Sequence, residues 1–344
     1  ISGVVGRDRR RRARGRDAAV WQRFAAEQAG VVSREQLLAA GCTAGQVGAL
    51  LDARRWTGLH LGVYAVFTGP LPAMTRAWAA VLLAGPGAAL GGTTALWLWG
   101  VLDGPKRLTV CVPWERRVRA PSGVVIVRRR RLNEVVHPGG SPPRVRLEEA
   151  LLDVVRCASR PGEVVDLVIR ATATRRTTPA RIRAALAQRP RMRHRALLVE
   201  MLGEVADGVQ SALESRYRRS VERAHGLPRA ERNRPEPVLD PSGRVVRRRY
   251  RDVRYRRWDT VVELDGLEAH PEWLRRFDRR RDNSVTLVGD HSLQYGWFEV
   301  VETPCQVAAD VVVVLRRAGW RGTPVACNAT CAVGPLIPDT TPLT

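Results

Sequence analysis

A long stretch without a single charged side chain, residues 77–102, constrains the fold of this chain more than any other feature. It is long enough to cross a lipid bilayer. However, residues 85–87 (Gly-Pro-Gly) divide it into two pieces of about a dozen residues, and Gly91-Gly92 followed by two threonines indicates a loop that leads into a new helix. We therefore expect two helices buried in a core rather than a membrane span.

The charge of the chain indicates a polyanionic partner. The formal net charge is +23 and the pI is about 11.4, more than solubility requires. Lys106 is the only lysine, so almost all of this charge is arginine, whose guanidinium fork fits phosphate oxygens. Nucleic acid is the favoured partner over an anionic membrane face. A GC-rich genome also encodes many arginines, and a merely solvated basic face is the alternative.

The amino-terminal part is predicted to be a flexible basic arm (residues 1–17) followed by a winged helix-turn-helix (residues 18–68). A helical apolar pattern comes first, Ser33 and Thr43 then cap two short helices, and residues 54–67 are typical of two short strands. Such a module binds DNA or, in the alternative, another protein. The candidate DNA contacts are Gln46 for a base edge and Arg54 and Arg55 for phosphates.

Residues 69–204 are predicted to form an α+β middle domain. Strand-like segments occur at residues 107–113 and 123–132, and residues 147–157 form an amphipathic pattern that begins a helical region. We expect the next domain boundary near residues 200–210.

The cysteines do not predict a complete metal site. Only Cys327 and Cys331 are close in sequence, as C-x-x-x-C, which is half a zinc site. The full set is Cys42, Cys111, Cys157, Cys305, Cys327 and Cys331. Because no second pair at zinc spacing exists and no secretory signal is visible, we expect unpaired thiols in a reduced cytoplasmic protein.

Two predicted strands in the carboxyl-terminal part carry acidic residues. Asp252 lies on an arginine-rich strand, Glu263 lies on the apolar strand at residues 260–264, and Asp265 follows it. Adjacent strands that each present an acid near one end can hold Mg²⁺ or Mn²⁺. Such a cation polarises a phosphodiester and acidifies a bound water. The alternative is that Asp265 belongs to a simple turn and that Asp252 is a surface residue.

Further residues complete the hypothesis of a hydrolytic site. Asp252 and Glu263 would be the metal ligands, Glu214 would hold an outer water, and Asp265 or His270 would orient or deprotonate the attacking water. Flanking phosphates would be bound by Arg275, Arg276, Arg279, Arg280 and Arg281.

The order of several motifs resembles the Vsr-like endonuclease-related domain of the PD-(D/E)XK superfamily. The motifs are S-x-L-E-S (211–215), G-L-P (226–228), R-D-V-R-Y (251–255), V-E-L-D-G (262–266), His270, F-D-R-R-R-D-N (277–283), and Gly296-Trp297 with Pro304. The resemblance covers about residues 205–322. It implies a mixed sheet flanked by helices, with Asp252 and Glu263 as metal-binding acids.

This chain departs from that family at two places. The superfamily lysine after the second acid is absent, as it also is in Vsr-like members, and Asp265 stands two positions after Glu263, so the general base stays unassigned. The segment F-E-V-V-E-T after Gly296-Trp297 is expected to be a strand, and relatives usually carry a basic residue there. Glu299 and Glu302 would instead bring negative charge toward the phosphate site.

The upstream part resembles proteins that place an AbiEi-type antitoxin winged helix ahead of such a domain. The matching segments are V-V-S-R-E-Q-L-L-A-A-G (31–41), L-G-V-Y (61–64) and R-V-R-L-E-E-A-L-L-D (144–153). The resemblance implies DNA and a cognate toxin as partners.

Together, these patterns predict an α+β multidomain protein. A restriction-endonuclease-like α/β domain with a mixed sheet (205–322) follows the winged helix-turn-helix and the middle α+β domain, and residues 323–344 form a tail. The first functional hypothesis is a divalent-metal-dependent DNA endonuclease without a membrane partner. The alternative is an AbiEi-like antitoxin or transcriptional regulator with an inert nuclease-like domain. An RNA-directed nuclease is the third.

Overall fold

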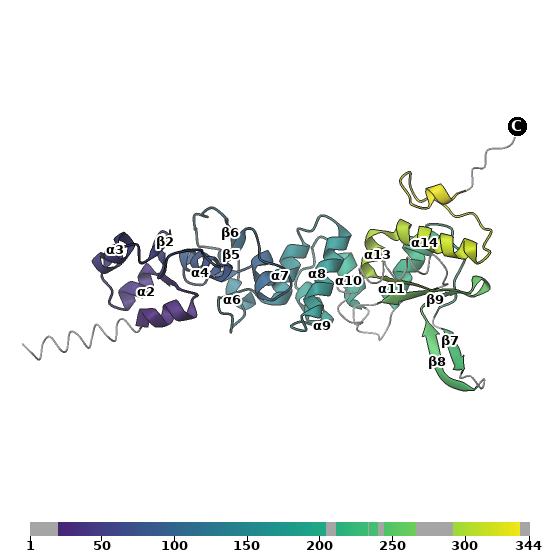
Figure 1. Cartoon of the computed structure of the whole chain (residues 1–344), viewed down its shortest axis with the longest axis horizontal. Helices are drawn as coiled ribbons and strands as arrows, with labels where there is room; N and C mark the ends of the chain where they lie inside the picture. The colour runs from purple at the N-terminus through teal and green to yellow at the C-terminus, as the bar shows by residue number, and fades with distance from the viewer. Residues whose placement is uncertain (1–19, 204–210, 233, 240–243, 266–291, 338–344) are drawn as a thin grey trace, which may run out of the picture. The chain divides into compact units, whose positions relative to one another are not determined.

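The computed structural model describes residues 20–203, 211–232, 234–239, 244–265 and 292–337, and it has mixed α/β architecture (Figure 1). The chain divides into two compact units, residues 1–154 and 155–344. The division falls inside helix α7 (Leu147–Val155). The predicted arm at residues 1–17 and the predicted boundary at residue 204 lie outside the described residues.

The first unit begins with helices and a small antiparallel sheet. Residues 20–27 are helical and are followed by β1 (Val31–Ser33), α2 (Arg34–Ala39), α3 (Ala44–Asp52), β2 (Thr57–His60) and β3 (Val63–Ala65). The strand order is β1-β3-β2. The two predicted helix starts and the predicted pair of strands are therefore confirmed, and β1 is a third strand that the sequence did not predict.

Local side-chain contacts explain the starts of α2 and α3. The Ser33 hydroxyl accepts a hydrogen bond from the Gln36 N–H, while the Gln36 side chain accepts one from the Ser33 N–H. Thr43 and Gln46 repeat this reciprocal pattern at α3. Each pair satisfies two backbone donors that an open helix end would leave to water.

The uncharged stretch forms two helices and a short strand. These are α4 (Ala73–Ala84), β4 (Ala89–Leu90) and α5 (Gly92–Leu98). Gly85 ends α4 with a positive φ of 81°, a conformation that costs glycine little because it lacks a Cβ atom. The expectation of two buried helices is confirmed, and in the described parts of the chain no helix has the length and apolar character needed to span a membrane.

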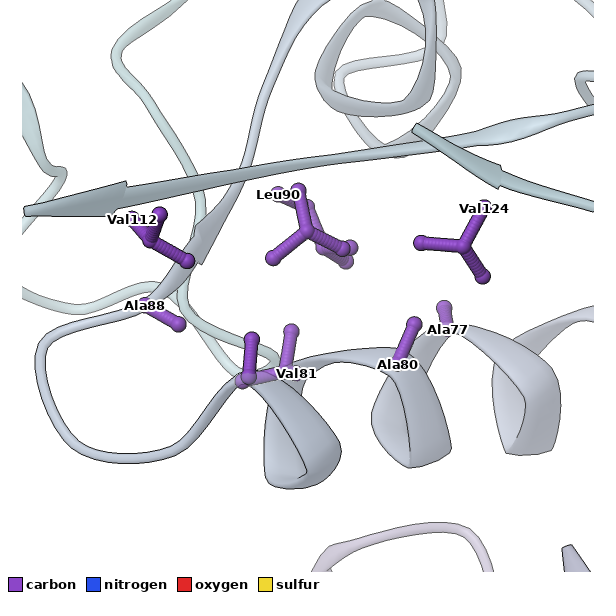
Figure 2. Close-up of a cluster of buried hydrophobic side chains, with 9 residues drawn as sticks. Ala77, Ala80, Val81, Ala88, Leu90, Val112 and Val124 are labelled. Carbon is purple, nitrogen blue, oxygen red and sulfur yellow. The ribbon is translucent and has the colours of Figure 1, made fainter. Parts of the chain in front are cut away.

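Helix α4 covers a sheet with the order β4-β5-β6, in which β5 (Leu108–Pro113) and β6 (Val124–Arg129) run parallel. Figure 2 shows Ala77, Ala80 and Val81 of α4 pointing toward Leu90, Val112 and Val124 on the sheet. Alanines on the helix let its backbone approach the sheet closely. The larger aliphatic side chains of the strands fill the space between the two layers.

An ion-pair network joins β6 to α7. Arg129 contacts the carboxylate of Glu149 and, at 2.7 Å, that of Asp153. Helix α6 (Leu132–Val135) lies between these elements in the sequence.

The second unit begins with helices and ends with a mixed sheet and its covering helices. The helices are α8 (Pro161–Ala173), α9 (Pro179–Ala187), α10 (Arg195–Gly203), α11 (Ser211–Tyr217) and the π-helix η1 (Arg218–Arg223). A hairpin of β7 (Arg234–Leu239) and β8 (Val245–Arg251) precedes β9 (Val253–Tyr255), the 3₁₀ turn η2 (Arg256–Trp258), β10 (Thr260–Asp265) and β11 (Ser292–Gly296). Helices α13 (Trp297–Glu302) and α14 (Pro304–Arg317) and the short turn η3 (Gly334–Leu336) follow.

Strand β10 is the centre of the sheet β11-β10-β9. It pairs antiparallel with β9 and parallel with β11. Thr260, Val262 and Leu264 are buried, whereas Glu263 and Asp265 are only partly buried. Val261, on the face of Glu263 and Asp265, is buried as well. Since side chains alternate between the two faces of a strand, the acids occupy the carboxyl-terminal part of the face opposite Val262 and Leu264. Helices α11, α13 and α14 pack against one another beside this sheet (Figure 1).

The expectation of a strand at F-E-V-V-E-T is wrong, because these residues belong to α13 and its end. Glu299 caps this helix by accepting a hydrogen bond from the Gly296 N–H at 3.0 Å. Trp297, Val300 and Val301 are buried, at the i, i+3 and i+4 spacing of one helix face. The β-branched valines resemble a strand locally, but the cap and the helical spacing of the apolar residues decide the structure.

The contact between α4 and its sheet predicts a large cost for shortening Leu90. Leu90→Ala should lower the free energy of unfolding by about 2–5 kcal/mol because it leaves a cavity in a fully buried layer. Chemical denaturation followed by circular dichroism measures this. Leu61→Ala is the matched control, since Leu61 is 96% exposed and should change stability by less than about 0.5 kcal/mol. Equal effects of the two variants would contradict the described core.

Candidate functional site

Glu263 and Asp265 lie on β10, and Asp252 lies just before its neighbour β9. Asp265 lies two residues beyond Glu263 and therefore on the same face of β10. Val253 of β9 pairs with Val262 of β10, and the two strands are antiparallel. Asp252 therefore lies next to the strand that carries Glu263 and Asp265.

Hydrogen bonds fix two of these carboxylates. Asp252, which is buried, accepts a hydrogen bond at Oδ2 from the Leu264 N–H at 2.7 Å. Asp265 accepts one at Oδ2 from the Gln294 side chain at 2.8 Å. Each carboxylate thus has a defined orientation.

Gln294 is a site residue that the sequence analysis missed. It lies on β11, in register with Glu263 of β10, between the buried side chains of Leu293 and Tyr295. The alternation of apolar and polar residues in S-L-Q-Y-G could have indicated a strand whose glutamine lies on the opposite face from the leucine and tyrosine. Gln294 and the two acids of β10 thus come from neighbouring parallel strands.

The other predicted members of the site have different outcomes. Glu214 lies on α11, in the helical layer, and is buried. The remaining predicted residues, His270, Arg275, Arg276, Arg279, Arg280 and Arg281, lie outside the described residues.

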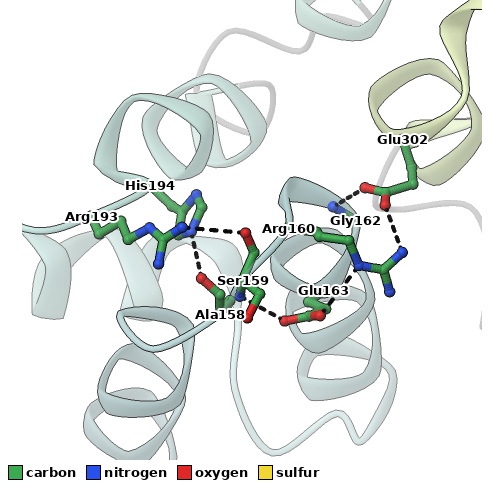
Figure 3. Close-up of polar contacts among 8 residues, drawn as sticks. All are labelled: Ala158, Ser159, Arg160, Gly162, Glu163, Arg193, His194 and Glu302. Carbon is green, nitrogen blue, oxygen red and sulfur yellow. Dashed lines mark hydrogen bonds and ion pairs between the residues drawn. The ribbon is translucent and has the colours of Figure 1, made fainter. Parts of the chain in front are cut away.

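Glu302, which we expected near the phosphate site, interacts with the start of α8. Its Oε2 accepts a hydrogen bond from the Gly162 N–H at 2.6 Å, and its Oε1 pairs with the Arg160 guanidinium at 3.0 Å. Figure 3 shows Glu302 reaching both partners, with Glu163 on the other side of Arg160. A carboxylate is favoured at a helix amino terminus, so Arg160 and the helix end balance the charge of Glu302.

A second set of contacts in Figure 3 holds the chain that precedes α8. The His194 ring nitrogen lies 3.0 Å from the carbonyl oxygen of Ala158, and Arg193 donates to the carbonyl oxygen of Ser159. The loop before α8 is thereby fixed at its backbone oxygens as well as through Glu302.

The predicted DNA contacts of the first unit are exposed at α3. The Gln46 side-chain oxygen accepts a hydrogen bond from the Thr43 N–H at 2.7 Å. Because that oxygen is occupied, the side-chain amide nitrogen of Gln46 is the group that could contact a base edge. Arg54 and Arg55 follow the end of α3 and are exposed, as phosphate-binding side chains must be.

A group of potential metal ligands also forms where the sequence predicted unpaired thiols. The ligand atoms of His225, Cys305, Cys327 and Cys331 all lie within 4.8 Å of one another. All six cysteines are free, as predicted, but three of them lie together with His225, which the sequence did not predict. The sequence could not show the group, because only C-x-x-x-C was visible as a local motif and its partners lie far away in the chain.

The pKa values of Cys305 and Cys331 shift in opposite directions: burial and the hydrogen bonds to Cys327 and Cys331 raise the pKa of Cys305 to about 12. Burial also raises the pKa of the Cys331 thiol, but the backbone groups of Val333 and Cys327 and the thiols of Cys305 and Cys327 form hydrogen bonds that together lower it to about 6. Thiolates are the form in which cysteine binds metals.

Comparison with known proteins identifies no family. No family model matches the chain, and no curated protein matches it. Among solved structures, the RV2827C protein from Mycobacterium tuberculosis is similar over 54% of this chain and 75% of that chain, with 20% sequence identity and a TM-score of 0.35. Similarity at this level identifies neither a family nor an activity.

The contact between Glu302 and α8 predicts an unusual cost for a glycine-to-alanine change. A Cβ atom on residue 162 would lie 2.4 Å from Glu302 Oε2, so Gly162→Ala must displace the carboxylate and should lower the free energy of unfolding by about 1–3 kcal/mol. Urea denaturation measures the loss. Gly203→Ala in α10 is the matched control, since nothing lies within 4 Å of a Cβ atom there. A Gly162→Ala protein as stable as this control would refute the contact.

Proposed function

We propose that this protein acts on DNA as a divalent-metal-dependent endonuclease, with a Vsr-like PD-(D/E)XK domain in its second unit. The observation that carries the proposal is the placement of Glu263 and Asp265 on β10 and of Asp252 just before β9, with the Asp252 carboxylate hydrogen-bonded to the β10 backbone at Leu264. In this fold type, an acid at the start of one strand and an acid on the next strand hold the cation. The mixed pairing of β10 with its two neighbours agrees with such a sheet.

The donor set fits a hard cation. Carboxylate oxygens are the ligands that Mg²⁺ and Mn²⁺ prefer, and Asp252 and Glu263 would hold the ion. When bound, the cation would polarise a phosphoryl oxygen and make a water more acidic. The Leu264 N–H keeps Asp252 oriented toward its partner strand. Asp265, oriented by Gln294, is the candidate base for the attacking water.

The first unit supports DNA as the substrate. Its helices α2 and α3 precede the hairpin β2-β3, and β1 completes the sheet, which is the element order of a winged helix-turn-helix. Arg54 and Arg55 are exposed where α3 ends. The excess of arginine over acidic residues throughout the chain favours attraction to phosphates.

A DNA-binding regulator of the AbiEi type, with an inert nuclease-like domain, is the second candidate. Asp265 occupies the position of the superfamily lysine, so an acidic side chain stands where the superfamily has a basic one. An acid in place of the lysine is compatible with the fold but reverses the charge of the side chain at this position. It is the observation that favours binding without cleavage.

Cleavage of supercoiled plasmid in Mg²⁺ or Mn²⁺ tests the proposal. Asp252→Asn and Glu263→Gln keep the size of each side chain but remove the anionic ligand, and each should slow cleavage by about 100-fold or more. Asp259→Asn is the matched control and should cut like the wild type. Asp259 is exposed and has a positive φ of 45°, which asparagine tolerates.

Two results would overturn the proposal. If Asp252→Asn and Glu263→Gln cut as fast as the wild type, the acids are not the site. If no cation supports cleavage, while the full chain binds duplex DNA with an affinity that falls steeply with salt, the regulator is the correct function.

A further inference from the structure

Four side chains from three separate segments converge beside the start of α14. His225 follows η1, Cys305 lies in the first turn of α14, and Cys327 and Cys331 lie in the segment after that helix. Their ligand atoms are all within 4.8 Å of one another, and the two sulfurs of Cys305 and Cys327 are 3.4 Å apart. Ligand atoms around a tetrahedral zinc ion lie roughly 3.5–3.8 Å apart, given Zn–S and Zn–N bonds of about 2.3 and 2.0 Å. The group therefore has the size of a zinc site.

The imidazole of His225 is oriented like that of a metal ligand. The ring is completely buried, and Nδ1 lies 2.9 Å from the carbonyl oxygen of Val221. A backbone carbonyl only accepts, so Nδ1 carries the proton and Nε2 has the free lone pair. Within the described parts of the chain, this buried Nε2 has no hydrogen-bond partner. In histidines that bind metals, the ring nitrogen that does not contact the metal typically donates a hydrogen bond to a carbonyl or carboxylate, as Nδ1 of His225 does here.

The segment that carries Cys327 and Cys331 is held by few other interactions. Residues 321–333 contain neither helix nor strand. The Val325 N–H donates to the His225 carbonyl oxygen at 2.9 Å, and a Cβ atom on Gly226 would lie only 3.0 Å from a Val325 methyl group. Glycine at position 226 permits this close approach. Between residues 321 and 330 only Pro324 is buried, so hydrophobic burial holds this stretch weakly and a cross-link would keep it in place.

We propose that His225, Cys305, Cys327 and Cys331 bind one structural zinc ion, which fastens residues 320–337 to the end of η1 and the start of α14. Three sulfurs and one imidazole select zinc over magnesium or calcium. Four protein ligands close the coordination sphere, as in structural rather than catalytic zinc sites. This site is separate from the acids of β10, so it stands or falls independently of the endonuclease proposal.

Metal analysis of the full chain is the first test. Protein purified without chelators should contain about one zinc ion per chain. Cys331→Ser and His225→Gln should each reduce the zinc content at least about tenfold. Cys157→Ser is the matched control, because Cys157 is exposed and outside the group, and it should keep its zinc. Equal zinc in all variants would overturn the assignment of ligands.

A second test uses only the wild-type chain, so it does not depend on the folding of a variant. Replacement of zinc by Co²⁺ should give the intense visible bands of a tetrahedral site and the charge-transfer absorption of cobalt thiolates. Removal of the metal should increase hydrogen exchange at the Val325 amide. A pale octahedral cobalt spectrum, the colour of an iron–sulfur cluster, or a Cys305–Cys327 disulfide in protein as purified without chelators, detected by mass spectrometry, would each overturn the proposal.

Discussion

The pairing of β10 with a neighbour on each side is the constraint on which the second unit depends. Alternate residues of β10 serve two purposes, because Val262 and Leu264 enter the core while Glu263 and Asp265 face outward. A register shift by one residue would bury the acids and expose the valine and leucine. The hydrophobic effect that fixes the core therefore also places the acids. The hydrogen bond from Leu264 to Asp252 then joins the start of β9 to the same arrangement.

Polar cross-links fix the parts of the second unit that hydrophobic burial alone does not. Glu302 at the end of α13 binds the amino terminus of α8 through the Gly162 N–H and Arg160. The group around His225 connects the irregular segment after α14 to the end of η1. Both contacts join segments that are far apart in the sequence. The zinc site would thus support the fold, and the acids of β10 would carry the chemistry.

The sequence predicted features that depend on local patterns. The glycines within residues 77–102, the caps Ser33 and Thr43, and the apolar strand at residues 260–264 each depend on a few neighbouring residues, and each is confirmed. Helix α13 was mistaken for a strand, because adjacent valines favour a strand and only the cap and tertiary packing reveal the helix. The His225 group and Gln294 were missed, because their partners are brought close only by folding. The predicted catalytic residue His270 lies outside the described residues.

The central claim is that the acids on β10 and before β9 form a cation site. The binding of Mn²⁺ to the full chain tests this claim most directly. Manganese prefers oxygen ligands and so distinguishes the acids from the cysteine group. Electron paramagnetic resonance of free Mn²⁺ should show about one bound ion per wild-type chain, with binding lost in Asp252→Asn and retained in Asp259→Asn. Undiminished Mn²⁺ binding by Asp252→Asn would contradict the account.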